Sequence, residues 1–240
     1  MFRPILASLT AALLLAACDE MPTSAAPGVE TPSTQPVSAS ARRAANQAAR
    51  SFVAVLDRME PVAESECRKR TTQVNCDFKI VVDDRPGVPA NAFQTLDRRG
   101  RPIIVFTLAL IEDARNADEL AFVMGHEAAH HIAGHIGRQQ QSAVDGAVIL
   151  SGLATLAGGD AAAVRRAQNL GAQVGARIYS KEFELEADAL GTILAARAGY
   201  DPVNGAQFFN RIPDPGDRFL GTHPPNAQRL AVVRKTAANL

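Results

Sequence analysis

The 240-residue chain has no tryptophan, no excess of either charge and no segment in which basic residues interleave with aromatic ones. Its 25 Lys and Arg residues balance 25 Asp and Glu residues. Because nucleic-acid-binding domains generally carry a basic surface, nothing in this composition favours a nucleic-acid partner. The length and the apolar content suffice for one sizeable core, so we expect one main folded domain.

A hydrophobic run long enough to cross a bilayer is also absent near the N-terminus. The apolar stretch at residues 5–15 is too short for a stable transmembrane helix, and small residues follow it. Residues 1–17 therefore have the form of a secretory signal peptide. The segment Leu15-Ala16-Ala17-Cys18 resembles the bacterial lipobox, whose cysteine is acylated. We expect a protein of the bacterial periplasm that is lipid-anchored through Cys18 to the inner or the outer membrane.

Residues 18–40 combine the lipidated cysteine with a tether rich in Pro, Ser, Thr and Ala. This segment has no apolar period, so we expect it to be flexible. Residues 41–240 should form the folded domain. Its first helix is predicted from Ala41 to Met59 by apolar residues at helical spacing, and Glu60-Pro61 should end it.

Cysteine is scarce, with three residues in all. Only Cys67 and Cys76 remain if Cys18 carries lipid. In an exported protein, an even pair so close in sequence predicts a disulfide, worth about 2.5–3 kcal/mol for a loop of this size.

The segment His126-Glu127-Ala128-Ala129-His130 carries the clearest chemical signal. On a helix, residues four apart project from one face, so both imidazoles can bind one tetrahedral zinc ion. Glu127 lies about 100° further round the helix, close enough to hold a water on that metal. The pattern predicts a zinc peptidase site with Glu127 as the general base.

The surrounding segment supports a buried metal helix. Asn116 and Glu119 form a predicted capping box, and residues 120–136 are apolar nearly all round. Imidazoles and a carboxylate inside such a helix are costly unless a metal compensates them. His131 and His135 form a second pair at the same spacing, but no carboxylate follows His131, so His126 and His130 are the favoured ligands. We expect the face of His131 and His135 to be solvated or to support the ligands from outside.

Two strands are predicted, at residues 77–82 and 101–106, and the turn signals between them indicate loops. A small sheet should therefore pack against the metal helix. In zinc peptidases of this general build, an edge strand pairs with an extended substrate. Asn91, Ala92 and Phe93 either lie beside that edge or form a plain surface turn.

Residues 142–159 are largely apolar but contain three glycines and Asp145 before Gly159. The run is too short and interrupted for a membrane span. We expect a helical hairpin that covers the site or rests on a membrane.

Four carboxylates follow within one predicted helix from residue 179 to residue 199. Glu184 and Asp188 flank its apolar stripe on one side, so Glu184 could complete the zinc site and Asp188 could orient a ligand imidazole. Glu182 and Glu186 have the same spacing on the other side. Periodicity does not choose between the two pairs, and a solvated acidic face would explain all four residues.

These motifs resemble metallopeptidase family forty-eight, a family of gluzincin zinc peptidases. The similarity extends from about Ile80 to Arg229. The matching segments are His126–His130, Glu184–Asp188, Asn91–Phe93, Asp118–Leu120, Ala198–Pro202, and Thr222–Pro225 with Arg229. The resemblance implies that Glu184 is the third zinc ligand, and that substitution of Glu182 or Glu186 by glutamine leaves zinc binding nearly intact. It also implies that His223 lies near the metal, and that His223 and Arg229 regulate the site or stabilise the transition state. Without the resemblance, His223 would be a surface residue in a turn.

The resemblance implies an α+β, zincin-like fold that is mainly helical and binds one Zn²⁺. The expected reaction is hydrolysis of internal peptide bonds in unfolded or misassembled cell-envelope proteins. Transmembrane helices of some family members and the helical repeats of others are missing, so we expect neither prenylated substrates nor recruitment through repeats. The alternative function is a lipoprotein chaperone or assembly factor with a closed, non-hydrolytic zinc site.

Overall fold

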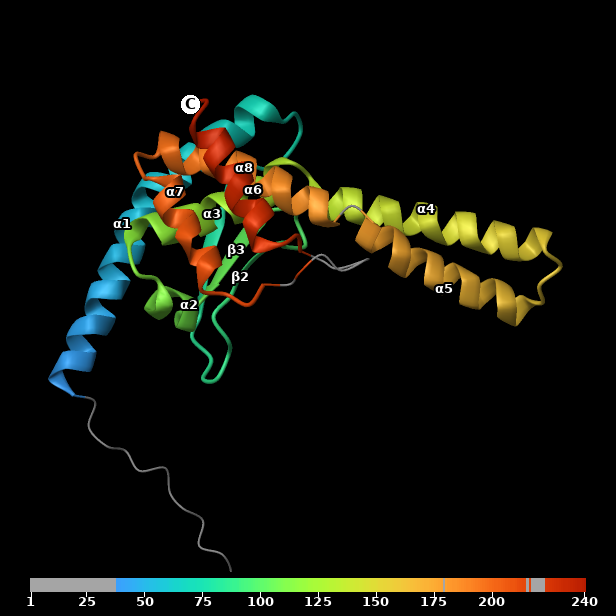
Figure 1. Cartoon of the computed structure of the whole chain (residues 1–240), viewed down its shortest axis with the longest axis horizontal. Helices are drawn as coiled ribbons and strands as arrows, with labels where there is room; N and C mark the ends of the chain where they lie inside the picture. The colour runs from blue at the N-terminus through green and yellow to red at the C-terminus, as the bar shows by residue number, and fades with distance from the viewer. Residues whose placement is uncertain (1–37, 179, 215, 217–222) are drawn as a thin grey trace, which may run out of the picture. The chain divides into compact units, whose positions relative to one another are not determined.

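A computed structural model describes residues 38–178, 180–214, 216 and 223–240 (Figure 1). The signal peptide, Cys18 and most of the tether lie outside these residues. The described chain is mainly helical with one small sheet, which confirms the expected α+β class. Its elements, in order, are α1 (Ala39–Arg70), β1 (Lys79–Asp83), β2 (Ala92–Leu96), β3 (Pro102–Thr107), α2 (Leu108–Asp113), α3 (Ala117–Ile132), α4 (His135–Leu156), α5 (Ala161–Ile178), α6 (Ser180–Arg197), α7 (Pro202–Gly205), η1 (Ala206–Asn210) and α8 (Asn226–Ala237).

The sheet has the strand order β1-β3-β2, with β1 parallel and β2 antiparallel to β3. The strands β1 and β3 lie where the sequence predicts strands. The strand β2 is an addition, because the sequence indicates only loops there. Its hairpin with β3 closes through Asp97, whose carboxylate accepts hydrogen bonds from the backbone N–H groups of Arg99 and Arg101. This local turn fixes the pairing of a strand whose own apolar pattern is weak.

Helix α1 does not end at Pro61, as the sequence predicts, but continues to Arg70. Proline removes one backbone hydrogen bond and usually ends a helix. Here Pro61 is exposed, while Met59, Ala63 and Cys67 continue one buried face past it. Burial of that face stabilises the last turns, and the carbonyl that loses its partner can be solvated.

Helix α3 ends at Ile132, four residues earlier than expected. Gly134 then adopts a left-handed conformation, with φ of 66°, and a new helix begins at His135. The corner depends on glycine, because side chains are rarely tolerated at such a φ angle. His131 and His135 consequently lie on different helices and cannot form the ligand pair that their spacing suggests.

The start of α3 is capped, although not as a full capping box. Asn116 accepts a hydrogen bond from the N–H of Glu119, as predicted. The carboxylate of Glu119 accepts from the N–H of Arg115, not from that of Asn116. It also pairs with Arg211, so Glu119 ties the start of α3 to the segment after η1.

Helices α3 and α6 cross at two glycines, Gly125 and Gly191. A Cβ atom on Gly125 would lie 2.8 Å from the carbonyl oxygen of Gly191, and one on Gly191 would lie 2.8 Å from the N atom of His126. The two backbones are therefore in direct contact. This crossing brings the segment that contains His126 and His130 next to the segment that contains Glu184 and Asp188.

Helices α4 and α5 form a hairpin that projects from the helical body (Figure 1). The sequence placed a hairpin within residues 142–159, but those residues form only the last part of α4 and the turn that follows it. Glycines also set this contact, because a Cβ on Gly171 would lie 2.1 Å from the carbonyl oxygen of Gly146. In the part of the chain that the structure describes, no helix is both long enough and apolar enough to cross a membrane.

A disulfide joins Cys67, near the end of α1, to Cys76, just before β1. The loop between them reaches the metal helix, where the carbonyl oxygen of Asn75 lies 2.7 Å from Nε2 of His131. The ring of His131 also packs edge-on against Phe78. His131 thus anchors this loop and does not face the other histidines.

Replacing Gly125 by alanine tests the helix crossing. The new methyl group must push α3 and α6 apart, so we expect a loss of about 1–3 kcal/mol of folding free energy. The matched control is Gly152→Ala on α4, where nothing lies within 4 Å of the added Cβ. There the higher helix propensity of alanine should leave stability unchanged or raise it by up to ~1 kcal/mol. Thermal unfolding of the metal-free proteins measures the stability of both variants. Equal melting temperatures for Gly125→Ala and Gly152→Ala would refute the close crossing.

Candidate metal centre

Three side chains from two helices converge on one point. His126 and His130 come from α3 and Glu184 comes from α6, and one ligand atom from each lies within 4.8 Å of the others. The Nε2 atoms of the two histidines are 3.0 Å apart. The carboxylate oxygens of Glu184 lie 3.5 Å from Nε2 of His126 and 3.4 Å from Nε2 of His130.

These separations fit a tetrahedral zinc ion. Bonds of about 2.1 Å to nitrogen and oxygen place neighbouring ligand atoms about 3.4 Å apart. Two imidazoles and one carboxylate also form a donor set typical of catalytic zinc sites, which leave the fourth position open. The three residues are therefore those that would hold a zinc ion.

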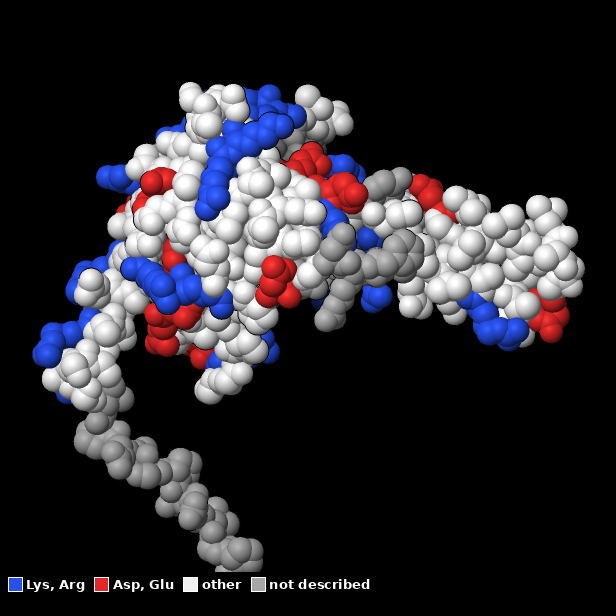
Figure 2. All heavy atoms as spheres, in the orientation of Figure 1, with Lys and Arg blue, Asp and Glu red and all other residues white. Residues whose placement is uncertain are grey.

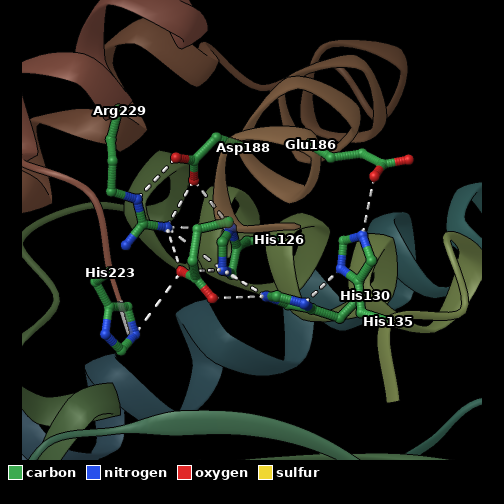
Figure 3. A network of polar contacts seen from close by, with 8 residues as sticks. His126, His130, His135, Glu186, Asp188, His223 and Arg229 are labelled. Atoms are coloured by element: carbon green, nitrogen blue, oxygen red, sulfur yellow. Dashed lines mark hydrogen bonds and ion pairs between the residues drawn. The ribbon is translucent and has the colours of Figure 1, made fainter. Parts of the chain in front are cut away.

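Asp188 and Arg229 support the first ligand from behind. Asp188 is fully buried on α6, and its Oδ1 lies 2.9 Å from Nδ1 of His126 (Figure 3). Arg229, on α8, donates two hydrogen bonds of 2.7 Å to the two oxygens of Asp188. Because the carboxylate accepts a hydrogen bond from Nδ1–H, Nε2 of His126 is left free to bind a metal.

The electrostatics of this cluster favour positive charge at the point where the ligands meet. Burial lowers the pKa of His126, but hydrogen bonds to Asp188 and Glu184 outweigh it and raise that pKa to about 10. Burial likewise opposes ionisation of Glu184, yet hydrogen bonds to His126 and His130 hold its pKa far below the usual range. A bound zinc ion would supply the positive charge and displace the proton.

The second ligand is held by two residues that the sequence left unassigned, His135 and Glu186. Nδ1 of His135 lies 2.8 Å from Nδ1 of His130, and Nε2 of His135 lies 3.2 Å from Oε2 of Glu186 (Figure 3). A carboxylate only accepts, so Nε2 of His135 carries the hydrogen and its Nδ1 accepts one from His130. This relay orients His130 as Asp188 orients His126.

The relay continues to the first turns of α4. Arg138 donates a hydrogen bond of 2.7 Å to Glu186, and Phe183 stacks on the ring of His135. Burial, followed by the charge of His130, lowers the pKa of His135 to about 4, so this ring is neutral near pH 7. Gly134 is the feature of the sequence that could have indicated this contact, since a left-handed residue before His135 can turn that side chain back toward His130.

His126, His130 and Glu184 line a cavity of about 700 Å³. Glu127 lines it and is partly exposed, and the edge strand β2 forms one side through Ala92, Phe93 and Gln94. Asn91 lines the cavity just before β2 and exchanges hydrogen bonds with Thr107, which pin the start of the strand. The three residues singled out from the sequence, Asn91, Ala92 and Phe93, thus lie at the same opening as Glu127.

His223 reaches the same cavity from the segment before α8. Its side chain is 53% exposed, and its Nε2 lies 3.8 Å from Oε2 of Glu184. It is therefore a neighbour of the ligand cluster (Figure 3). Glu182, by contrast, is exposed on α6 and is not among the residues that line the cavity.

Comparisons with known proteins point in one direction. A family model described as Peptidase family M48 matches residues 50–237. The chain is 32% identical over 141 residues to a Vibrio cholerae serotype O1 protein whose name describes a beta-barrel assembly-enhancing protease. It is 30% identical over 135 residues to the mitochondrial metalloendopeptidase OMA1 of Arabidopsis thaliana, and 30% identical over 150 residues to the beta-barrel assembly-enhancing protease of Escherichia coli strain K12.

These alignments cover 52%, 55% and 56% of this chain, in the same order. They cover only 28%, 27% and 30% of the relatives. The chain therefore spans less than a third of the length of the curated relatives it matches, so the substrates and partners of those larger proteins do not transfer to it directly.

Substitution of the glutamates on α6 tests the ligand assignment. Glu184→Gln should weaken zinc binding by more than a hundredfold, since changes outside the ligand sphere already cost about 10–100-fold. Glu182→Gln, on the same helix and exposed, is the matched control and should leave zinc affinity unchanged. The sequence predicts that Glu186→Gln leaves zinc binding nearly intact. The contact of Glu186 with His135 instead predicts that this substitution lowers zinc affinity roughly tenfold.

Competition with a fluorescent chelator measures the three zinc affinities. Circular dichroism before and after zinc removal separates a binding defect from unfolding. A loss of affinity in Glu182→Gln that equals the loss in Glu184→Gln would contradict this ligand set.

Proposed function

Because the chain belongs to peptidase family M48, whose model matches residues 50–237, we propose that it is a zinc-dependent metalloendopeptidase with a zincin-like, gluzincin fold. The observation that carries this proposal is the convergence of His126, His130 and Glu184 beside Glu127 in an open cavity. A purely structural site would need neither the open side nor a carboxylate next to it.

Each residue of the site then has a defined task in hydrolysis. Zinc, when bound, supplies a Lewis acid that lowers the pKa of water and polarises the scissile carbonyl. Glu127 accepts the proton of the attacking water and passes it to the leaving amine. Asp188 accepts a hydrogen bond from Nδ1–H of His126, and Nδ1 of His135 accepts one from Nδ1–H of His130, so both ligand rings keep one tautomer.

Arg229 contributes a buried positive charge to this arrangement. Its guanidinium bonds to both oxygens of Asp188 and lies 3.4 Å from Oε2 of Glu184. It stacks 4.1 Å from the ring centre of Phe209, which fixes its plane. Two carboxylates this close to each other would repel, and Arg229 allows both to remain ionised.

The substrate is proposed to bind as an extended strand along β2. Only one edge of β2 pairs within the described sheet, where it meets β3, and its residues 92–94 line the cavity. Backbone hydrogen bonds to an edge strand recognise an extended chain with little regard for its sequence. Unfolded or misassembled polypeptides fit this mode better than folded ones do.

The compartment is proposed from the N-terminal sequence together with the relatives. A signal peptide at residues 1–17 and an acylated Cys18 would place the domain in the periplasm on a membrane. The names of two relatives refer to beta-barrel assembly, which takes place in the bacterial envelope. Cell-envelope proteins are therefore the proposed substrates.

Glu127→Gln tests the proposed activity. The substitution removes the proton acceptor but keeps the size of the side chain, so zinc content should stay near one per chain while casein cleavage falls by at least about a hundredfold. Metal analysis and fluorescent casein measure the two quantities, with Glu182→Gln as the active control. Bound zinc without any Glu127-dependent cleavage would favour the alternative, a client-binding chaperone.

We further propose that His223 restrains the enzyme. Its imidazole stands in the cavity 3.8 Å from the ligand Glu184, where a substrate has to enter, and Pro224 and Pro225 limit the backbone beside it. A segment that must swing away before substrate binds would suppress unwanted cleavage.

For His223→Ala, zinc content should be unchanged and casein cleavage should be about two- to tenfold faster than in the wild type, as expected when a gating contact is removed. Initial rates over a range of casein concentrations provide the measurement. Slower cleavage with full zinc would instead assign His223 to stabilisation of the transition state, and an equal rate would leave it with no role in the reaction.

A further inference from the structure

The hairpin of α4 and α5 carries an apolar face that the described chain does not cover. Val148, Ile149 and Leu153 on α4 are 57–65% exposed, and Leu156 at its end is 87% exposed. In Figure 2 most of the outer part of the hairpin is white, and its blue and red atoms gather along the lower edge. Exposed apolar surface this continuous marks an interaction site in a soluble domain.

These side chains are not needed to hold the hairpin together. The two helices meet instead through glycines, with Gly146 against Gly171 and Gly175 against the backbone of Ser142. The inner faces are therefore packed by backbone contact, and the large apolar residues point outward. Their exposure is a property of the folded hairpin, not a sign of incomplete packing.

The charges of the hairpin are arranged around this face. Residues 146–159 contain no charged side chain. The acidic residues on either side serve the fold, since Asp145 accepts from Gln141 and Asp160 caps the first turn of α5. On α5, Arg165 and Arg166 are exposed, and residues 161–178 contain no acidic residue to balance them.

We propose that this hairpin lies on an anionic lipid membrane, with the apolar face of α4 in the interface and Arg165 and Arg166 at the phosphate groups. Exposed Leu, Ile and Val side chains on α4 and exposed arginines on α5 suit an element that lies at a membrane interface. No helix of the described chain could cross the bilayer, so the hairpin rests on the surface. The positive charge of Arg165 and Arg166, which no acidic residue of α5 balances, complements anionic phosphate groups.

The proposed contact is separate from the lipid anchor expected at Cys18. It is also separate from the proposed peptidase activity, because neither the apolar face nor the two arginines lines the cavity. The test therefore uses the full chain with Cys18→Ser, which removes the acylation site, and measures binding to vesicles and not hydrolysis.

Because the chain has no tryptophan, a single introduced one reports its own surroundings. Leu153→Trp should shift its emission to shorter wavelength when vesicles of phosphatidylethanolamine and phosphatidylglycerol are added. Val53→Trp on α1 is the matched control, since Val53 is 55% exposed and Leu153 is 57% exposed. Its emission should not change.

Flotation with the same vesicles supplies an independent measurement. Val148→Ser with Leu153→Ser and Leu156→Ser should lower the bound fraction at least tenfold, because three apolar side chains that would insert into the membrane are lost. Arg165→Gln with Arg166→Gln should weaken binding to phosphatidylglycerol vesicles by roughly tenfold and leave phosphatidylcholine binding unchanged. All of these positions are exposed, and circular dichroism verifies that each variant is folded.

The proposal is overturned if the Cys18→Ser chain does not float with anionic vesicles, or if the triple serine variant floats as well as its parent. A concentration-dependent dimer that the triple variant abolishes, with no vesicle binding, would assign the face to a second copy of the chain.

Discussion

The contact between the backbones of Gly125 and Gly191 is the constraint on which the centre depends. Ligand atoms on α3 and α6 can approach within 3.5 Å only because the two helix axes approach without intervening side chains. One methyl group at either glycine would widen the crossing by more than a zinc site tolerates. The close approach of the two helices and the spacing of the ligand atoms therefore both depend on Gly125 and Gly191.

Around that crossing, the protein buries more ionisable groups than a core of this size normally accepts. Glu184, Asp188, His126 and Arg229 lie within hydrogen-bond or ion-pair distance of one another. Each would be costly alone, and each is compensated by the others. Such a set resists rearrangement, because moving one member leaves a buried charge without its partner. These buried groups lower the stability of the fold, but they hold the ligand rings in a fixed orientation.

Much of the site could be predicted from the sequence because helical spacing is a local property. His126, Glu127 and His130 follow from one turn of helix, and the α+β class follows from the apolar patterns. Periodicity could not choose between the pair Glu184 and Asp188 and the pair Glu182 and Glu186, since the two pairs flank the same stripe with the same spacing. The choice came from the resemblance, and the crossing at Gly191 gives its physical reason. That crossing is a contact between distant segments, which spacing does not encode.

The errors in the prediction also have physical causes. Proline was expected to end α1 at Pro61, but burial of Ala63 and Cys67 outweighed the lost hydrogen bond. Helix α3 was expected to run to Ile136, but Gly134 turned the chain. That turn brought His135 back to His130, so His135, which was expected to be solvated or to support the ligands, contacts His130. In α1 tertiary burial outweighed the local sequence pattern, and after α3 one left-handed glycine did.

The hairpin also explains why a fixed spacing between the two halves of the site is unnecessary. Its ends join α3 and α6, which the glycine crossing holds together, and its middle contacts mainly itself. Residues could therefore be gained or lost at the tip in matched numbers without moving any ligand. The length of the segment between His130 and Glu184 is therefore not fixed by the geometry of the ligand cluster.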